Sequence, residues 1–162
     1  MKLNNKNNKV AIIMGSQSDY PVMQDCEKIF KVLKIKYEVL IVSAHRTPKR
    51  MFEFAEKAEK KGFKVIVSGA GGAAHLCGMV ASLTSLPVIG VPIESKKLKG
   101  LDSLLSISQM PRGIPVGCVA INGAFNAGLL AASIIGNFDQ KVKSNLDKWR
   151  RTQTKSVKKK PK

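Results

Sequence analysis

The stretch Val42-Ser43-Ala44-His45-Arg46-Thr47-Pro48 joins an apolar run to a helix-like one and decides the fold. The run before it, residues 37–42, predicts a buried strand, and residues 48–61 predict a helix. Pro48 suits the first helical position and Thr47 the N-cap, so the helix is expected to start there. A strand, a loop and a helix in this order form the repeating unit of α/β proteins.

The same unit recurs along the chain. The expected strands are residues 10–14, 37–42, 64–68, 87–91 and 116–120. The expected helices are residues 19–33, 48–61, 76–83, 102–109, 123–135 and 139–151. Strands rich in Val and Ile that alternate with helices imply a parallel sheet covered on both faces. We therefore predict a three-layer α/β/α sandwich, a flavodoxin-like parallel sheet of order 2-1-3-4-5, with a C-terminal helix.

Length and charge set the domain organisation. At 162 residues the chain fits one domain, expected at residues 9–152, between a disordered N-terminus (1–8) and a basic disordered tail (153–162). The net charge is +17, of which residues 141–162 carry +9 and residues 10–140 only +5. The tail can bind nucleic acid through phosphate contacts or can simply be solvated. The modest central charge suits a small anionic substrate better than a long polyanion.

The sequence contains no signal for export or membrane insertion. No apolar run approaches about 18 residues, and the Asn- and Lys-rich start lacks the apolar segment of a secretory signal. Three widely spaced cysteines, Cys26, Cys77 and Cys118, argue against a disulfide framework and against a zinc site. We expect a cytoplasmic protein with reduced thiols.

Residues 43–46 offer three kinds of chemistry in one strand-to-helix loop. Ser43 supplies a hydroxyl, Arg46 a cation suited to a phosphate, and His45 an imidazole, the side chain that titrates near neutral pH. The N-terminus of the following helix also favours an anion. Alternatively, His45 is a helix-flanking residue without chemistry.

Two further loops are expected to lie beside this one. Residues 15–19 follow the first predicted strand and residues 69–75 the third. In the order 2-1-3-4-5 these strands are neighbours, so all three loops are expected at one edge of the sheet, where open α/β sheets bind ligands. In the first loop Ser16 and Ser18 can donate to phosphate oxygens, while Asp19 either caps a helix or accepts from sugar hydroxyls.

The third loop has two interpretations. Gly69, Gly71 and Ala74 fit the pattern G-x-G-x-x-G/A, with Glu94 about 20 residues further on, as in dinucleotide sites. Its place in the third unit and the closing His75 argue against that interpretation. The loop can instead cover a planar ring and hold a carboxylate or CO2 with its backbone N–H groups. Close helix–strand packing explains one or two of the glycines but not the whole run.

Five motifs together carry a family resemblance. They are GSQSD at residues 15–19, SAHRTP at 43–48, GAGGAAHL at 69–76, DSLLS at 102–106 and MPRGIPV at 110–116. Over about residues 9–152 the chain closely resembles the catalytic subunit of phosphoribosylaminoimidazole carboxylase (class I PurE family), whose bacterial form is the N5-carboxyaminoimidazole ribonucleotide mutase. The resemblance implies a flavodoxin-like isomerase of de novo purine synthesis that moves a carboxylate from N5 to C4 of the imidazole ring. It also implies no cofactor, no metal, no nucleic acid or membrane partner, and assembly as a homo-octamer.

The resemblance assigns a role to each matching position. His45 is expected to transfer protons, the side chains of the first two loops to bind ribose phosphate, and residues 71–76 to hold the carboxylate. The substrate-binding residues so implied are Ser16, Ser18, Asp19, Ser43, Ala44, Arg46, Ala70, Gly71, Gly72, Ala73, His75 and Leu76.

Departures and rival interpretations are also visible. Cys77 stands where the family pattern has Pro, and the segment 121–126 is shorter than in some members. The nearest rival is the branch of the family that carboxylates aminoimidazole ribonucleotide directly with CO2; Arg46, where that branch tends to carry Lys, favours the mutase. More distant rivals are a non-catalytic nucleotide-binding module and a nicotinamide enzyme built on the glycine loop.

Overall fold

A computed structural model describes residues 8–161 of the chain, and the N-terminus predicted to be disordered, residues 1–8, lies outside them except for its last residue. The strands are β1 (Lys9–Met14), β2 (Lys36–Ile41), β3 (Phe63–Gly71), β4 (Val88–Ile93) and β5 (Gly117–Cys118). The α-helices are α1 (Tyr20–Leu33), α2 (Pro48–Lys57), α3 (His75–Ala81), α4 (Leu101–Ser108), α5 (Ala124–Gly136) and α6 (Gln140–Ser156), and a single 3₁₀ turn spans Gln17–Asp19. No helix within the described residues is long and apolar enough to cross a membrane.

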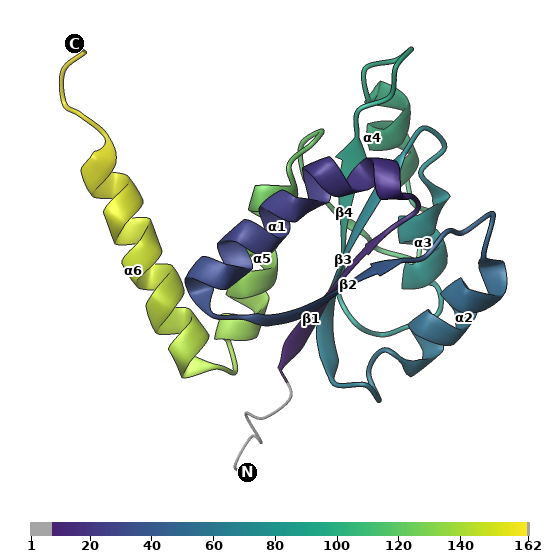
Figure 1. Ribbon diagram of the computed structural model, residues 1–162, viewed down its shortest axis with the longest axis horizontal. Coiled ribbons are helices and arrows are strands. Elements are labelled where there is room, and N and C mark those ends of the chain that lie inside the picture. Colours follow the sequence, from purple (N-terminus) through teal and green to yellow (C-terminus); the bar gives the residue numbers. More distant parts are fainter. Residues whose placement is uncertain (1–7, 162) are drawn as a thin grey trace.

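The predicted sheet is confirmed. The five strands pair in parallel in the order β2-β1-β3-β4-β5. In Figure 1, α1, α5 and α6 lie on one side of the sheet and α2, α3 and α4 on the other, which gives the expected three layers. The parallel crossovers therefore bring the carboxyl ends of β1 to β4 to one edge, as the loop argument required.

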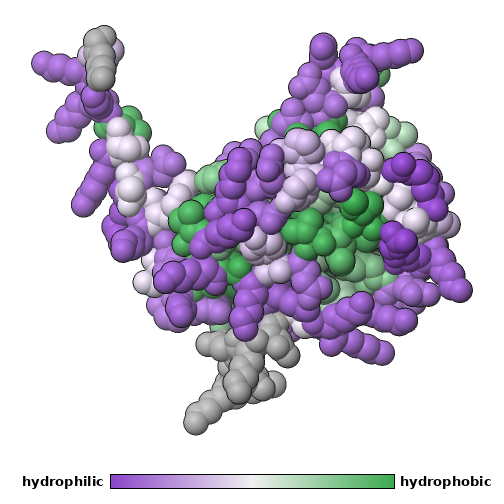
Figure 2. Space-filling model, in the orientation of Figure 1, coloured by the Kyte–Doolittle hydropathy of each residue, from purple (hydrophilic) through white to green (hydrophobic). Residues whose placement is uncertain are grey.

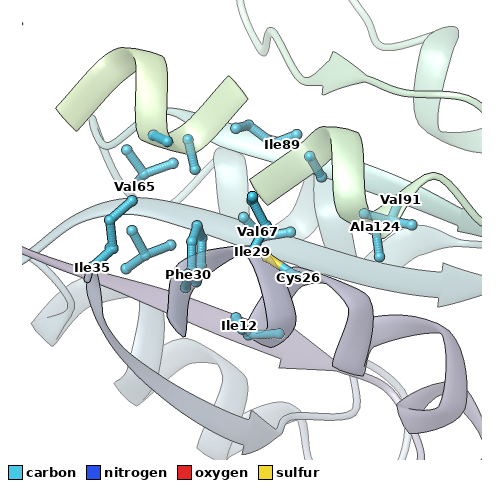
Figure 3. Packing of buried hydrophobic residues seen from close by; sticks show 14 of the residues in the cluster. Ile12, Cys26, Ile29, Phe30, Ile35, Val65, Val67, Ile89, Val91 and Ala124 are labelled. Carbon is cyan, nitrogen blue, oxygen red and sulfur yellow. The ribbon is translucent and has the colours of Figure 1, made fainter. Parts of the chain in front are cut away.

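Alternation along the strands builds two cores. Val10 and Ile12 of β1 face α1, α5 and α6, while Ala11 and Ile13 face the opposite helices. Figure 3 shows the first core, in which Phe30 of α1 packs among aliphatic side chains of the sheet. Burial of these apolar surfaces on both faces fixes the sheet, and with it the loops at its edge.

Several strand and helix boundaries differ from the predicted ones. β3 continues to Gly71 because Ala70 and Gly71 pair with β4, so the first part of the expected glycine loop is strand. β5 is only two residues long and pairs with β4 at the edge of the sheet, so most of the expected strand 116–120 is irregular. α2 ends at Lys57 rather than Lys61, and a turn at Gly62 (φ 86°) leads into β3.

The sequence placed the start of a disordered tail at residue 153, whereas the structure continues α6 through this position. α6 runs to Ser156, and Asp139 caps its first turn by accepting from the Lys141 and Val142 N–H groups. Buried Val142 and Leu146 anchor the same helix to α1 and α5. Only residues 157–161 of the described tail lie outside regular structure.

Candidate active site

One cavity of about 470 Å³ lies at the carboxyl edge of the sheet. It is lined by Gly15, Ser16, Ser18, Asp19, Ser43, Ala44, His45, Arg46, Ala70, Gly71, Gly72, Ala73, His75, Leu76, Ile93, Glu94 and Ser95. Every residue singled out from the sequence as catalytic or substrate-binding is in this set. The structure therefore brings together all three loops, as their topology predicted.

The set also contains residues that the sequence reasoning missed. Ile93 is the last residue of β4, the neighbour of β3 in the predicted order, and Glu94 and Ser95 follow it. The rule that gathered the first three loops at one edge applies equally to the loop after β4, so the signal was present in the topology.

The loop after β2 is held by its own side chains. Thr47 occupies the N-cap position of α2, but its hydroxyl makes no capping bond. It donates instead to the Ser43 carbonyl and accepts from the Ser43 N–H, both at 3.0 Å. The Ser43 hydroxyl in turn accepts from the Arg46 N–H at 3.2 Å. This closed set of local bonds fixes where His45 and Arg46 leave the backbone.

Arg46 ties the second loop to the first. Its Nη2 donates to the Gly15 carbonyl at 2.7 Å, and its Nε donates to Ser43 Oγ at 3.4 Å. The guanidinium still has further N–H groups available for a ligand in the cavity. A fixed cation between two loops that carry hydroxyls is a fitting site for a phosphate.

Asp19 lies at the N-cap position of α1 without capping it. Its carboxylate accepts from the Ser18 hydroxyl at 3.4 Å, and the charge of Arg46 lies near it. Partial burial raises the pKa of this carboxyl above its ordinary value, and hydrogen bonds from Ser16 and Ser18 act against that rise. Because the helix does not use the carboxylate, the structure favours the interpretation in which Asp19 faces a ligand.

His45 meets a second imidazole across the cavity. The distance from His45 Nε2 to His75 Nδ1 is 2.8 Å, and the rings meet edge to face with centroids 5.0 Å apart. At this distance one nitrogen donates and the other accepts, so the pair holds one hydrogen between two bases. Both side chains are exposed in the single chain, and a ligand can reach them. This contact in the cavity favours a functional role for His45 over the interpretation as a helix-flanking residue without chemistry.

The glycine segment does not have the geometry of a dinucleotide fingerprint. Gly69 and Gly71 lie inside β3, whereas the fingerprint needs its glycines in the turn between strand and helix. A Cβ at Gly69 would meet the thioether of Met23 in α1, so this glycine serves helix–strand packing. Gly72 has a φ of +65° with open space beside it, so its backbone conformation is what requires glycine.

Cys77 follows this segment as a structural residue. Its thiol is buried and donates toward Ser68 Oγ at 3.2 Å, and burial raises its pKa to about 12. A buried thiol with a raised pKa has little thiolate character, so Cys77 acts in packing. Across residues 8–161, no group of three or more His, Cys, Asp or Glu side chains is arranged to hold a metal ion.

Comparison with known proteins agrees with the fold and shows the family of the chain. A structural neighbour is the crystal structure of Treponema denticola PurE, with a TM-score of 0.83, 27% sequence identity, and coverage of 91% of this chain and 92% of that chain. Curated relatives named N5-carboxyaminoimidazole ribonucleotide mutase include that of Escherichia coli K12, 53% identical over 96% of this chain and 94% of the relative. Another, from Saccharolobus solfataricus, is 64% identical over 79% of this chain and 81% of the relative. The sequence profile of AIR carboxylase matches residues 9–156, so this chain belongs to the AIR carboxylase family.

Proposed function

We propose that this chain is an N5-carboxyaminoimidazole ribonucleotide mutase of de novo purine biosynthesis. It would move the carboxylate of its substrate from N5 to C4 and release 4-carboxy-5-aminoimidazole ribonucleotide. The observation that carries the proposal is the cavity in which the His45–His75 pair lies between phosphate-suited loops and the glycine segment. The names of the relatives support the same reaction.

The first two loops would bind the ribose phosphate. Arg46 offers charge-assisted N–H groups, and Ser16, Ser18 and Ser43 surround it with hydroxyls. The Asp19 carboxylate would accept from ribose hydroxyls, which donate but do not repel it. These anchors lie in loops fixed by local bonds, so they would hold the imidazole ring in one place while the carboxyl group moves.

The imidazole pair would store the proton that the reaction needs. His45 donates a proton to N5, the N5–carboxylate bond breaks, and its electron pair remains on nitrogen while CO2 departs. The resulting aminoimidazole attacks CO2 through C4, and His45 then recovers the proton from the C4–H bond. One proton is lent and returned, with no net oxidation or reduction. General acid–base catalysis of this kind contributes roughly 10²–10⁴-fold per proton transfer.

The glycine segment would hold CO2 between the two steps. The Gly72 N–H donates to Ser103 and the His75 N–H donates to the Ala73 carbonyl. Among the described residues this leaves the N–H groups of Ala73 and Ala74 as the donors of this turn without a protein acceptor. They would bind the carboxylate or CO2, and closure of the turn over the ring would keep water out.

The assembly that we propose is the homo-octamer implied by the family resemblance. Apolar side chains gather over β2, which is an edge strand, on the face shown in Figure 2. Ile41 is 40% exposed there, and Leu98, Leu101 and Leu105 are about half exposed around α4. Patches of this kind on a small protein favour contact with a second copy. Light scattering of the purified protein measures the oligomer size directly.

Free thiols and the biosynthetic role support a cytoplasmic location.

A two-substrate assay tests the function. The purified protein is offered N5-carboxyaminoimidazole ribonucleotide in one reaction and aminoimidazole ribonucleotide with CO2 in the other. The proposal requires conversion of the first at a rate well above that of the second. Turnover of aminoimidazole ribonucleotide with CO2, and none of the carboxyamino compound, would instead establish a direct carboxylase. No turnover in either reaction would leave the non-catalytic module.

A further inference from the structure

The motif DSLLS at residues 102–106 has no role in the reaction described so far, although it belongs to the resemblance. None of Asp102, Ser103 and Ser106 lines the cavity. They lie in the first two turns of α4, behind the wall that the glycine segment and the end of β4 form. Their hydrogen bonds nevertheless reach three residues that do line it.

Ser103 joins two walls of the cavity. Its hydroxyl is fully buried, donates to the Ile93 carbonyl at 2.7 Å and accepts from the Gly72 N–H at 2.8 Å. Both partners line the cavity, one from β4 and one from the turn after β3. A buried hydroxyl whose donor and acceptor capacities are both used fixes the distance and orientation of the groups it connects.

Two neighbours strengthen this connection. One carboxylate oxygen of Asp102 accepts from the Ser103 N–H at 2.9 Å and from the Ser95 hydroxyl at 2.8 Å, so the loop after β4 is held to the same helix end. Ser106 donates mainly to the Asp102 carbonyl at 2.7 Å, and the Gly72 carbonyl lies 3.4 Å from the same hydroxyl. Both the N–H and the C=O of Gly72 therefore face serines of α4.

We propose that Ser103, supported by Asp102 and Ser106, is the positioning residue that sets the glycine turn in the shape that retains CO2. Gly72 has a φ of +65°, and a Cβ at this position would meet no atom within 4 Å, so side-chain packing does not determine the direction of its peptide. Ser103 determines it by taking the Gly72 N–H, and this aims the following Ala73 and Ala74 N–H groups. The inference deepens the proposed function and rests on it.

The proposed role of Ser103 predicts an effect on kcat without an effect on substrate binding. The hydrogen bonds of Ser103 go to Gly72, Asp102 and Ile93 and not to the first two loops, so removal of its hydroxyl is expected to leave ribose phosphate binding intact. It releases the Gly72 peptide, and displacements of about 1 Å at a reacting group can cost about 100-fold in rate. For Ser103→Ala we expect kcat to fall about 10- to 100-fold while KM stays within about twofold. A larger share of turnovers should end as aminoimidazole ribonucleotide and free CO2.

The experiment compares Ser103→Ala with three other variants. Ser103→Thr keeps the hydroxyl and should restore most of kcat. Ser106→Ala loses the bond to the Asp102 carbonyl within α4 and, toward the glycine turn, only the 3.4 Å contact to the Gly72 carbonyl, so it should change kcat less than Ser103→Ala. Ser133→Ala is the matched control, because Ser133 Oγ donates to the Leu129 carbonyl within α5, away from the cavity. Each variant is checked by circular dichroism and thermal melting, and hydrogen exchange is followed in peptides that cover residues 70–76 and 36–42.

The readouts distinguish this inference from the proposed function. Faster exchange confined to residues 70–76 in Ser103→Ala, with a fall in kcat and loss of CO2, supports the positioning role. Wild-type exchange in these residues, or a rise in KM equal to the fall in kcat/KM, overturns it. If the wild-type protein turns over neither nucleotide, the proposed function fails, while the exchange measurement still decides whether Ser103 holds the turn.

Discussion

The two halves of the cavity are built in opposite ways. The loops after β1 and β2 present side chains, and bonds among Ser43, Arg46, Thr47 and Gly15 hold them in place. The turn after β3 presents backbone, and Ser103, about 30 residues further along the chain, holds it from behind. The side chains of the second loop are therefore held largely by bonds within residues 43–47. The backbone of the glycine turn is held by a residue outside its own motif.

The largest expected effect comes from His45, which faces His75 of the other half across the cavity. His45→Asn keeps a side chain of similar size with hydrogen-bonding groups, but an amide does not transfer protons at neutral pH. We expect kcat to fall by at least about 1,000-fold, because two proton transfers use this residue. Product binding, measured by calorimetry, should be nearly unchanged.

His75→Asn sharpens the same test. An amide at this position can still hydrogen-bond to His45, so we expect a smaller loss, about 10- to 100-fold, within the range of a single proton transfer. A His45→Asn variant with kcat near wild type would show that another group moves the proton. Equal losses in the two variants would show that the imidazoles act as one unit.

Arg46 tests the side-chain half. Arg46→Ala removes both the proposed phosphate contact and the bond to the Gly15 carbonyl. Hydrogen bonds to charged groups contribute about 1.5–3 kcal/mol, so KM should rise about 10- to 100-fold. Arg50→Ala is the control, since Arg50 donates to the Ile41 carbonyl outside the cavity. A KM that stays at the wild-type value in Arg46→Ala would move the phosphate to another site.

Asp19 tests whether the side-chain half gives up stability for its proposed ligand. Burial raises the pKa of Asp19 in the folded protein, so the fold favours the neutral acid, and that stabilisation is lost as pH rises through the folded-state pKa. Asp19→Asn, a neutral mimic of the acid, should therefore melt at a higher temperature than wild type at pH 7. The difference should shrink as pH falls and the wild-type carboxyl takes up its proton.

The same variant should lose affinity. Without its carboxylate the site loses the acceptor proposed for ribose hydroxyls, and KM should rise about 10-fold, equivalent to one hydrogen bond of about 1.4 kcal/mol. Asp25→Asn serves as the control, because Asp25 forms a surface ion pair with Lys28 at 2.7 Å and lies outside the cavity. A lower melting temperature for Asp19→Asn than for wild type would show that the carboxylate stabilises the fold.

Gly72 tests the backbone half with a smaller expected effect. Gly72→Ala meets no atoms but places an L residue at φ +65°, at a cost of about 1 kcal/mol. Gly113, at φ +100° and also in open space, is a matched control outside the cavity. Melting temperatures should fall similarly in Gly72→Ala and Gly113→Ala. Only Gly72→Ala should lower kcat, by a few-fold, through release of CO2; a similar loss in Gly113→Ala would contradict the distinction.

The contrast between the halves also explains what the sequence could predict. Period and strand order placed residues 15–19, 43–46 and 69–75 at one edge, because those follow from local pattern and topology. The role of Ser103 was not predictable, since nothing in DSLLS indicates that a helix will turn its serines toward a glycine. The length of β3 was missed because pairing with β4 decided it, and α6 was cut short because a Lys-rich composition was taken for disorder.

The smallest expected effect concerns the basic end of the chain. α6 packs on α1 and α5, and Figure 1 shows its C-terminal end on the far side of the molecule from the carboxyl ends of the strands. Removal of residues 157–162 keeps all of α6. It takes away four lysines, Lys158, Lys159, Lys160 and Lys162. We expect kcat/KM to stay within about twofold, since charges more than a Debye length of about 8–10 Å away are screened at physiological salt. A marked loss of kcat/KM would mean that the tail of one subunit reaches the cavity of another and contributes to the site there.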